Sequence, residues 1–279
     1  MTKDEDSSQV DRSFHNKTAS VYDDEITSIY RIYHEIGLKS WVERLPQSTG
    51  NAVIGLDIGT GTGVVALKLT RKCQKVIGLD HSTGMLQVAS KKAEMLGLSD
   101  PMFFVNADCH NLPFPDSSFD VVTIQGTLHH FGSVQLRPTV SEIARVVKLG
   151  GRLYVSEPCV ESNPLGRLFD SLVRRTRKVV RCLRHPFAAG IRILGSSVGT
   201  PPAMAVGLVG KHPDEGPICS KELLSVLREF HFETSCLYLV HLCEAISFPE
   251  KVRLVLTKVL SLPFSRTRGD IVFVYGIKR

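Results

Sequence analysis

The stretch from 53 to 66, VIGLDIGTGTGVVA, constrains the fold more than any other part of the chain. An apolar run that carries Asp57 leads into three glycines at every second position, Gly59, Gly61 and Gly63. This pattern fits a tight turn between a strand and a helix, where missing Cβ atoms let a ligand approach the backbone and the first helical turn offers unpaired N–H groups. The stretch therefore predicts a strand-turn-helix unit that contacts a ligand.

Short β-branched runs alternate with amphipathic stretches from 53 to 158, the pattern of β-α-β units on a parallel sheet. The runs predict strands at 52–58, 75–80, 102–107, 119–125 and 152–157. The amphipathic stretches predict helices at 63–72, 82–97 and 135–151. Ser82 is the predicted N-cap of the second helix, and the glycine pair at 150–151 is predicted to close the third.

Beyond 158 this alternation breaks, and the pattern becomes that of one helical insertion. Residues 165–184 place apolar residues on one helical face and most basic residues on the other, and a Gly/Pro-rich loop follows. A helix with Ser220 at its N-cap, a strand at 232–240 and a closing strand within 269–278 complete the α/β pattern. We predict an N-terminal arm and first helix at 1–40, a binding core at 41–158, a basic lid insertion at 159–217, and the rest of the same domain at 218–279.

The composition favours a protein of the cytoplasm. The first twelve residues, MTKDEDSSQVDR, fit neither a signal peptide nor a transit peptide, and no apolar run approaches the roughly 20 residues of a membrane span. Seven cysteines stand singly, without a C-x-x-C pair, which suits reduced thiols. Neither zinc nor a disulfide framework is expected from this spacing.

The net charge of +6 belongs to one element. Residues 167–192 hold eight Lys or Arg against one acid, so this segment alone carries +7. A basic amphipathic helix of this kind fits three roles: it can lie on an anionic membrane, track nucleic-acid phosphates, or pack on the domain with its charges in solvent.

The glycine turn by itself suits two kinds of nucleotide cofactor. A dinucleotide site favours G-x-G-x-x-G, but Val64 stands where its third glycine would be, and Gly63 comes one residue early. Asp80 ends the second predicted strand, where either kind of site places a ribose-binding acid. The segments that follow discriminate: Asp108 comes after the third strand, Asp120 starts the fourth, and the chain runs on through GTLHHF.

With these motifs in order, the sequence resembles the class I S-adenosylmethionine-dependent methyltransferases, in particular the type 11 group that includes the ubiquinone and menaquinone biosynthesis methyltransferases. The resemblance covers about residues 14–158 and the terminal strand. It implies an α/β fold with a Rossmann-like, seven-stranded, mostly parallel sheet, a terminal antiparallel strand at the sheet edge, helices on both faces, and a helical lid insertion. It also implies S-adenosyl-L-methionine as the cofactor.

The resemblance also implies which residues bind the cofactor. The methionine end would lie on the glycine turn with the first acid nearby, the ribose on the second strand-end acid, and the adenine beside the segments after the second and third strands. Gln125 would line the methionine side, and Tyr22 matches an arm residue that closes over the cofactor. The implied cofactor-binding set is Tyr22, Asp57, Gly59, Thr60, Gly61, Gly63, Asp80, Met85, Ala107, Asp108 and Gln125.

The chemistry of such a site asks little of the protein, because a sulfonium methyl is already activated and the protein aligns it with the nucleophile. No metal is required. A general base is needed only where the acceptor must lose a proton. His129 and His130 follow the fourth strand and are the candidates, with His130 the better one. Alternatively, the two histidines only shape the pocket. Asp120, at the start of the fourth predicted strand, is expected to hold the strand start by hydrogen bonds.

The acceptor is predicted to be a small hydrophobic molecule, quinone-like or lipid-linked, because the lid is rich in Leu, Phe and Val. The basic face of 165–184 suits peripheral contact with an anionic membrane. An RNA (tRNA) methyltransferase that uses the basic segment is the alternative, although that helix carries one aromatic residue, Phe169, on its apolar face. A non-catalytic binding protein that keeps the fold is a third reading, which the intact acids and glycines disfavour.

Overall fold

The computed structural model describes residues 3–23, 37–45, 52–131, 133–159, 218–239 and 271–279. The chain divides into two compact units. The first comprises residues 1–160, 212–237 and 272–279, and everything below concerns this unit. The predicted lid, 159–217, and its amphipathic segment, 165–184, lie outside the described residues, apart from Cys159 at the start of the lid.

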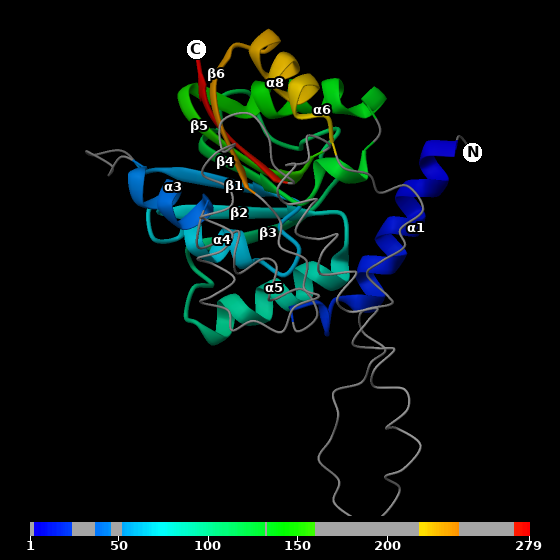
Figure 1. The fold of residues 1–279 in the computed structure, drawn as a ribbon. Coiled ribbons are helices and arrows are strands. Elements are labelled where there is room, and N and C mark those ends of the chain that lie inside the picture. The colour runs from blue at the N-terminus through cyan, green and yellow to red at the C-terminus, as the bar shows by residue number, and fades with distance from the viewer. Residues whose placement is uncertain (1–2, 24–36, 46–51, 132, 160–217, 240–270) are drawn as a thin grey trace, which may run out of the picture. The chain divides into compact units, whose positions relative to one another are not determined.

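A seven-stranded sheet forms the centre of the first unit, in the order β3-β2-β1-β4-β5-β7-β6 (Figure 1). Its strands are β1 (Ile54–Ile58), β2 (Lys75–Asp80), β3 (Met102–Asn106), β4 (Phe119–Gln125), β5 (Val147–Pro158), β6 (Phe232–Leu239) and β7 (Ile271–Lys278). The strands from β1 to β5 pair in parallel, and one strand of the seven is antiparallel. The order reverses between β1 and β4, which opens a crevice at their carboxyl ends. The predicted α/β fold class is confirmed.

Helices cover both faces of this sheet (Figure 1). They are α1 (Lys3–Thr18), α3 (Lys39–Arg44), α4 (Val64–Leu69), α5 (Thr83–Met95), α6 (Ser133–Val146) and α8 (Ser220–Glu229), with a short 3-10 helix, η2 (Leu128–His130). Helices α4 and α5 lie on one face, and α6 and α8 pack together on the other. No helix among the described residues is long and apolar enough to cross a membrane.

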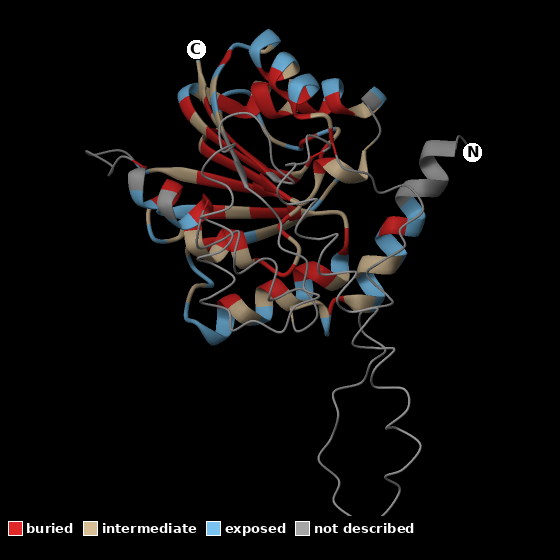
Figure 2. Cartoon of the chain, in the orientation of Figure 1, coloured by how far each residue is buried: buried red, intermediate tan, exposed pale blue. Residues whose placement is uncertain are grey.

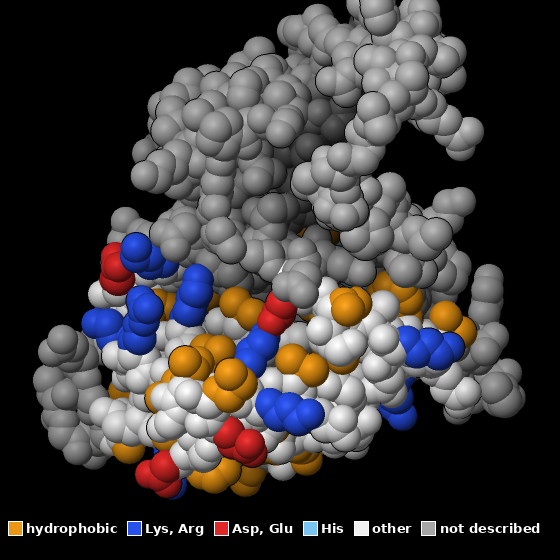
Figure 3. Space-filling view, turned by 90° about the horizontal axis from the view of Figure 1, so that it is seen from below, with side chains coloured by type: hydrophobic (Ala, Val, Ile, Leu, Met, Phe, Trp, Pro, Cys, Tyr) orange, Lys and Arg blue, Asp and Glu red, His pale blue; other side chains and the backbone are white. Residues whose placement is uncertain are grey.

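The burial follows from this layering. Strands β1 and β4 lie in the middle of the sheet and are buried almost throughout, and α5 turns Met85, Leu86 and Ala89 toward the sheet. Figure 2 shows the buried residues on the central strands and on the helix faces that meet them. On the face seen in Figure 3, the described basic and acidic side chains are interspersed among hydrophobic ones.

Three local predictions need correction. Helix α6 ends at Val146, and the glycine pair 150–151 lies inside β5, which pairs Phe119 with Val147 before its register shifts. The terminal strand β7 lies between β5 and β6, so the sheet edge is β6. Ser220 is the first residue of α8 rather than its cap, because Cys219 holds the extended N-cap conformation. By contrast, the Ser82 cap is confirmed: its Oγ accepts a hydrogen bond from the Met85 N–H at 3.2 Å.

Helix α1 is held at the crevice by a polar contact with the start of α5. Asn16 Oδ1 accepts hydrogen bonds from Ser82 Oγ and from the Gly84 N–H, both at 2.8 Å. A Cβ on Gly84 would lie 3.0 Å from Asn16 Cα, so the absence of a side chain there permits the approach. This contact brings one face of α1 to the carboxyl ends of the strands.

Candidate functional site

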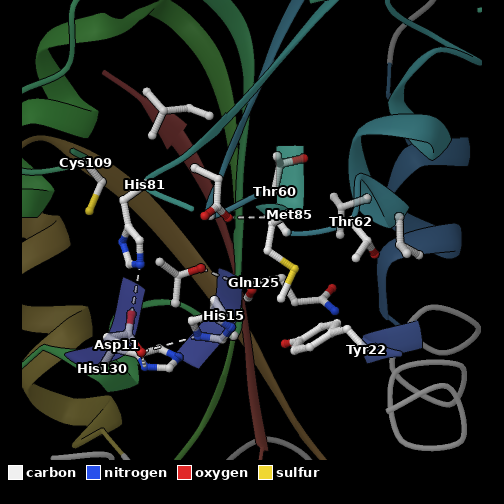
Figure 4. Close-up of a pocket in the computed structure, with 18 of the residues that line it drawn as sticks. Asp11, His15, Tyr22, Thr60, Thr62, His81, Met85, Cys109, Gln125 and His130 are labelled. Carbon is white, nitrogen blue, oxygen red and sulfur yellow. Dashed lines mark hydrogen bonds and ion pairs between the residues drawn. The ribbon is translucent and has the colours of Figure 1, made fainter. Parts of the chain in front are cut away.

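A cavity of about 360 Å³ lies at the carboxyl ends of β1, β2 and β4. Its wall is formed by the glycine turn, the end of β2, the segments that follow β3 and β4, and one face of the N-terminal arm (Figure 4). The lining residues are Asp11, His15, Tyr22, Asp23, Gly59, Thr60, Gly61, Thr62, Val64, Val65, Lys68, Leu79, Asp80, His81, Met85, Ala107, Cys109, Gln125, Gly126, Thr127, His130 and Phe131. Ligands of open α/β sheets bind at this edge.

The three glycines of the turn have different tasks. All three have positive φ, which disfavours a side chain. A Cβ on Gly59 would lie 2.0 Å from Thr127 Oγ1, and one on Gly63 would lie 3.0 Å from Ala89 Cβ, so both positions are set by packing. A Cβ on Gly61 meets no atom of the structure within 4 Å. Gly61 therefore keeps open the part of the cavity wall where a ligand can reach the backbone.

Asp57 lies beneath the turn and does not line the cavity. Its Oδ2 accepts from Thr60 Oγ1 at 2.7 Å and from the Ala66 N–H at 3.1 Å, and its Oδ1 accepts from Thr123 Oγ1 at 2.7 Å. Burial raises the pKa of Asp57 to about 7, although these hydrogen bonds act in the opposite direction. Asp57 thus shapes the turn through Thr60, which does line the cavity.

Asp80 ends β2 and lines the cavity, as predicted for a ribose-binding acid. Its Oδ2 accepts a hydrogen bond from the Gly61 N–H and its Oδ1 one from the Ser82 N–H, both at 2.8 Å. The carboxylate therefore joins the glycine turn to the start of α5.

Two of the three residues predicted to lie beside the adenine are found at the cavity. Met85 and Ala107 line the cavity, and Met85 is buried. Asp108 is not among the lining residues: its side chain is 57% exposed and its Oδ1 lies 2.6 Å from His110 Nδ1. The hydrogen bond with His110 lowers the pKa of Asp108 to about 2.

Gln125 and the N-terminal arm form the opposite part of the wall. The buried Gln125 Oε1 has no hydrogen-bond partner among the residues that the structure describes, and the residue lines the cavity. Tyr22 also lines it, and the neighbouring Asp23 accepts a hydrogen bond from Thr62 Oγ1 at 2.5 Å and pairs with Lys92. The arm residue predicted from the sequence, Tyr22, therefore lies in the cavity wall, and its neighbour Asp23 contacts the glycine turn.

The two histidines after β4 are placed differently. His129 Nδ1 lies 2.8 Å from Oε2 of the buried Glu157, and His129 does not line the cavity. Oε1 of Glu157 accepts from the Thr127 and Leu128 N–H groups at 2.8 and 2.9 Å, which fixes the start of η2. His130 does line the cavity. The preference for His130 as the candidate that faces an acceptor agrees with this placement.

Sequence reasoning missed a cluster around Asp11. The carboxylate of this buried residue lies 3.3 Å from His15 Nε2, 3.2 Å from His130 Nδ1 and 3.1 Å from His81 Nε2, and all four residues line the cavity (Figure 4). Burial alone would raise the pKa of Asp11, but the pairing with the three histidines outweighs it and holds the pKa well below its usual range. The spacing of Asp11 and His15, four residues apart on one helix face, was the available signal.

Asp120 makes structural hydrogen bonds, as the sequence predicted, but they reach beyond its own strand. Its Oδ2 accepts from the Ile54 N–H and from Lys148 Nζ, both at 2.9 Å, so this acid at the start of β4 holds the start of β1. Cys109 is a buried residue of the wall, and burial raises the pKa of its thiol.

The core of the chain is similar to known methyltransferases. Residues 56–155 match the methyltransferase domain family. The chain is 37% identical over 122 residues to an uncharacterized methyltransferase, YcgJ, of Bacillus subtilis strain 168, a match that covers 44% of this chain and 47% of that protein. It is 41% identical over 104 residues to a demethylmenaquinone methyltransferase of Thermus thermophilus, covering 37% and 46%. The chain thus spans about half the length of the curated relatives that it matches.

A solved structure agrees over a longer range. The crystal structure of a Thermotoga maritima protein, titled a SAM-dependent methyltransferase and possible histamine N-methyltransferase, superposes with a TM-score of 0.55 at 19% identity, over 96% of this chain and 99% of that one. The resemblance predicted from the motifs is confirmed by the match of residues 56–155 to the methyltransferase domain family, and the solved structure shows the same fold.

Proposed function

We propose that this chain, with a methyltransferase domain at its core, is an S-adenosylmethionine-dependent methyltransferase that acts on a small hydrophobic acceptor. The cavity carries the proposal: at the switch point of the sheet, the strand-end acid Asp80 meets the open backbone of Gly61, and the buried Gln125 Oε1 faces the same space. These features offer a carboxylate for ribose hydroxyls, an open backbone surface at Gly61, and an amide for the amino acid end of the cofactor.

When bound, S-adenosylmethionine supplies a methyl group activated by the positive charge on sulfur. The residues that line the cavity would hold and align it: Asp80 would bind the ribose, Met85 and Ala107 would flank the base, and Gln125 would face the methionine end. Tyr22 and one face of α1 form part of the cavity wall, and we expect them to limit the access of water to the bound cofactor. The contribution of the chain is thus to align the methyl group with the acceptor and to limit the access of water, which are the main requirements of an in-line transfer.

The acceptor side of the proposal rests on the apolar part of the wall. Val64, Val65, Leu79, Met85 and Phe131 line the cavity together with the polar groups. Relatives named demethylmenaquinone methyltransferases favour a quinone-like acceptor. His130 is the histidine of the pair that reaches an acceptor, and where that acceptor must lose a proton, it is the candidate base.

The first experiment measures binding of S-adenosylhomocysteine by titration calorimetry. We expect Asp80→Asn to weaken binding at least tenfold, since the amide offers one acceptor oxygen where the carboxylate offers two. The control is Asp116→Asn, which changes an exposed carboxylate paired with Arg145 outside the cavity. Equal affinity of Asp80→Asn and the wild type would contradict the assignment of the ribose site.

The second experiment identifies the acceptor class. The chain is incubated with methyl-labelled S-adenosylmethionine and a cell extract, and the label is partitioned into organic, RNA, protein and aqueous fractions. We expect label in the organic phase. Label in RNA would overturn the hydrophobic acceptor in favour of the nucleic-acid alternative, and a wild type that binds the cofactor but labels no fraction would contradict the transfer activity itself.

A further inference from the structure

We propose that Asp11, His15 and His130 form a binding site for one divalent transition-metal ion in the wall of the cavity, and that His81 orients the carboxylate of this site. The proposal goes beyond the methyl-transfer function, which requires no metal. A His130 that binds the ion through Nδ1 carries its proton on Nε2, so in the metal-bound chain it is a ligand and not the general base. It rests on four side chains from three segments of the chain that meet at one point: α1, the residue after β2, and η2.

The distances between the ligand atoms suit a shared ion. One ligand atom from each of Asp11, His15 and His130 lies within 4.8 Å of the other two, and Asp11 Oδ1 is 3.3 Å from His15 Nε2 and 3.2 Å from His130 Nδ1. Ligands about 2.0–2.1 Å from a tetrahedral zinc ion stand about 3.3 Å apart. The spacing around Oδ1 is therefore compatible with neighbouring ligands on one ion.

The local structure provides a rigid base for two of the ligands. Asp11 and His15 are four residues apart on α1, so their side chains project from the same helix face. Asn16 on the same helix is bonded to the start of α5, which fixes α1 over the cavity. The third ligand, His130, comes from η2, whose first N–H groups are held by Glu157.

The second oxygen of Asp11 has a different neighbour. Oδ2 lies 3.1 Å from His81 Nε2, which leaves Oδ1 directed to His15 and His130 (Figure 4). Carboxylate ligands of metal ions are commonly held by a further hydrogen bond that fixes their orientation and basicity. His81 has the position of such a partner, so we class it as a positioning residue and not as a ligand.

The ligand set selects the class of metal. Two imidazoles and one carboxylate suit Zn²⁺, Fe²⁺ or Co²⁺, while Mg²⁺ and Ca²⁺ favour sites made of oxygen. The side chains of Asp11, His15 and His130 are only 9%, 15% and 13% exposed, and all three line the cavity. Three protein ligands do not complete the coordination of such an ion, and catalytic sites of this kind bind water or substrate in a further position. We expect an oxygen atom of the acceptor to be a ligand of this sort.

The other described group with metal-binding side chains is less suitable. Asp108, Cys109 and His110 follow one another in a single loop, and Asp108 is exposed and paired with His110. A cysteine binds a metal ion as the thiolate, whereas burial raises the pKa of the Cys109 thiol and so favours its protonated form. This loop supplies the matched control for the experiment.

The test uses the full chain, treated with a chelator and then titrated with Co²⁺, with the visible d–d absorption of the bound ion as the readout. We expect saturation at about one ion per chain. Asp11→Asn and His15→Gln should lose saturable binding, and His81→Ala should bind roughly 10-fold to 100-fold more weakly. His110→Ala should bind as the wild type does. Circular dichroism and thermal unfolding of each variant report whether it has folded.

Two outcomes would overturn the site. One is a folded wild type that shows no saturable Co²⁺ absorption. The other is loss of binding in His110→Ala while His15→Gln retains it, which would place the ion in the other loop. S-adenosylhomocysteine binding is measured on the same samples by calorimetry, so a wild type that binds this molecule but not Co²⁺ contradicts the metal site and leaves the proposed function standing.

Discussion

His129 Nδ1 lies 2.8 Å from Oε2 of Glu157, so a buried carboxylate stands directly beneath the histidine pair that follows β4. The other oxygen of Glu157 holds the Thr127 and Leu128 N–H groups. One side chain of β5 thus fixes both the backbone of η2 and the ring of His129. This explains why two adjacent histidines have different environments: one is held from below, and the other faces the cavity.

Glu157→Ala is expected to lower the free energy of unfolding by about 2–5 kcal/mol, because it leaves two backbone N–H groups without an acceptor. Glu157→Gln should cost only about 1 kcal/mol, since the amide oxygen still accepts a hydrogen bond. Urea denaturation measures both. The matched control is Glu229→Gln on the exposed Arg137 pair, which is expected to leave the free energy of unfolding nearly unchanged, because solvent screens an exposed ion pair. Equal stability of Glu157→Ala and the wild type would refute the role of Glu157.

The free energy of unfolding should depend on pH through the ionisation of Asp57. Its pKa is about 7 in the folded chain, raised by burial, and near 3.9 in the unfolded chain, so the folded state holds the extra proton between these values. The free energy of unfolding therefore falls as pH rises from about 4 to 7 and changes no further from this group above that range. Asp57→Asn removes this slope.

Denaturant unfolding at several pH values between 5 and 8 measures the effect of Asp57. The quantity of interest is the difference between the wild type and Asp57→Asn, since histidines that titrate in both proteins cancel. We expect the variant to gain in relative stability as the pH rises. A constant difference across the range would show that Asp57 is already ionised at pH 5.

Two glycines of the turn should separate packing from binding. Gly59→Ala is expected to lower the free energy of unfolding by about 2–4 kcal/mol, because its Cβ would overlap Thr127 and its φ is +65°. Gly61→Ala should cost about 1 kcal/mol of conformational strain, yet weaken S-adenosylhomocysteine binding at least tenfold, because its Cβ enters the cavity wall. Thermal unfolding and calorimetry on the same two variants check this. The reverse order of effects would contradict the assignment.

The position of helix α1 against α5 should depend on the hydrogen bonds of Asn16. Asn16→Ala removes the hydrogen bonds to Ser82 and Gly84, at a cost of about 1–2 kcal/mol, and should release α1 from α5. Hydrogen exchange of the amides in 3–23 would rise, and cofactor binding would weaken, because α1 carries part of the cavity wall. Lys17→Ala, an exposed neighbour on α1, serves as the control. Unchanged exchange in Asn16→Ala would mean that other contacts seat the helix.

Much of the fold was predictable because its signals are local. The strand before Asp57, the glycine turn, the acid at the end of β2 and the Ser82 cap each lie within a few residues of the chain, and each was predicted correctly. The start of β5 was not, because pairing with Phe119 across the sheet extends the strand back to Val147, through glycines that by local criteria end a helix. Strand order is likewise a matter of pairing, which is why β7 was misplaced.

In the candidate site too, some features follow from local sequence and others from tertiary packing. The sequence by itself determined the strand-turn-helix unit, the positions of Asp80 and Gln125, and the family of the core, because spacing along the chain sets which side chains reach the carboxyl edge of a parallel sheet. Only the tertiary structure decided that Asp57 is buried, and that Asp11, beside His15 on its own helix, meets His81 and His130 from other segments. It also decided that Asp108 turns to the neighbouring His110 and does not line the cavity. Each outcome depends on burial and on how distant segments pack together, which the spacing of residues along the chain does not fix.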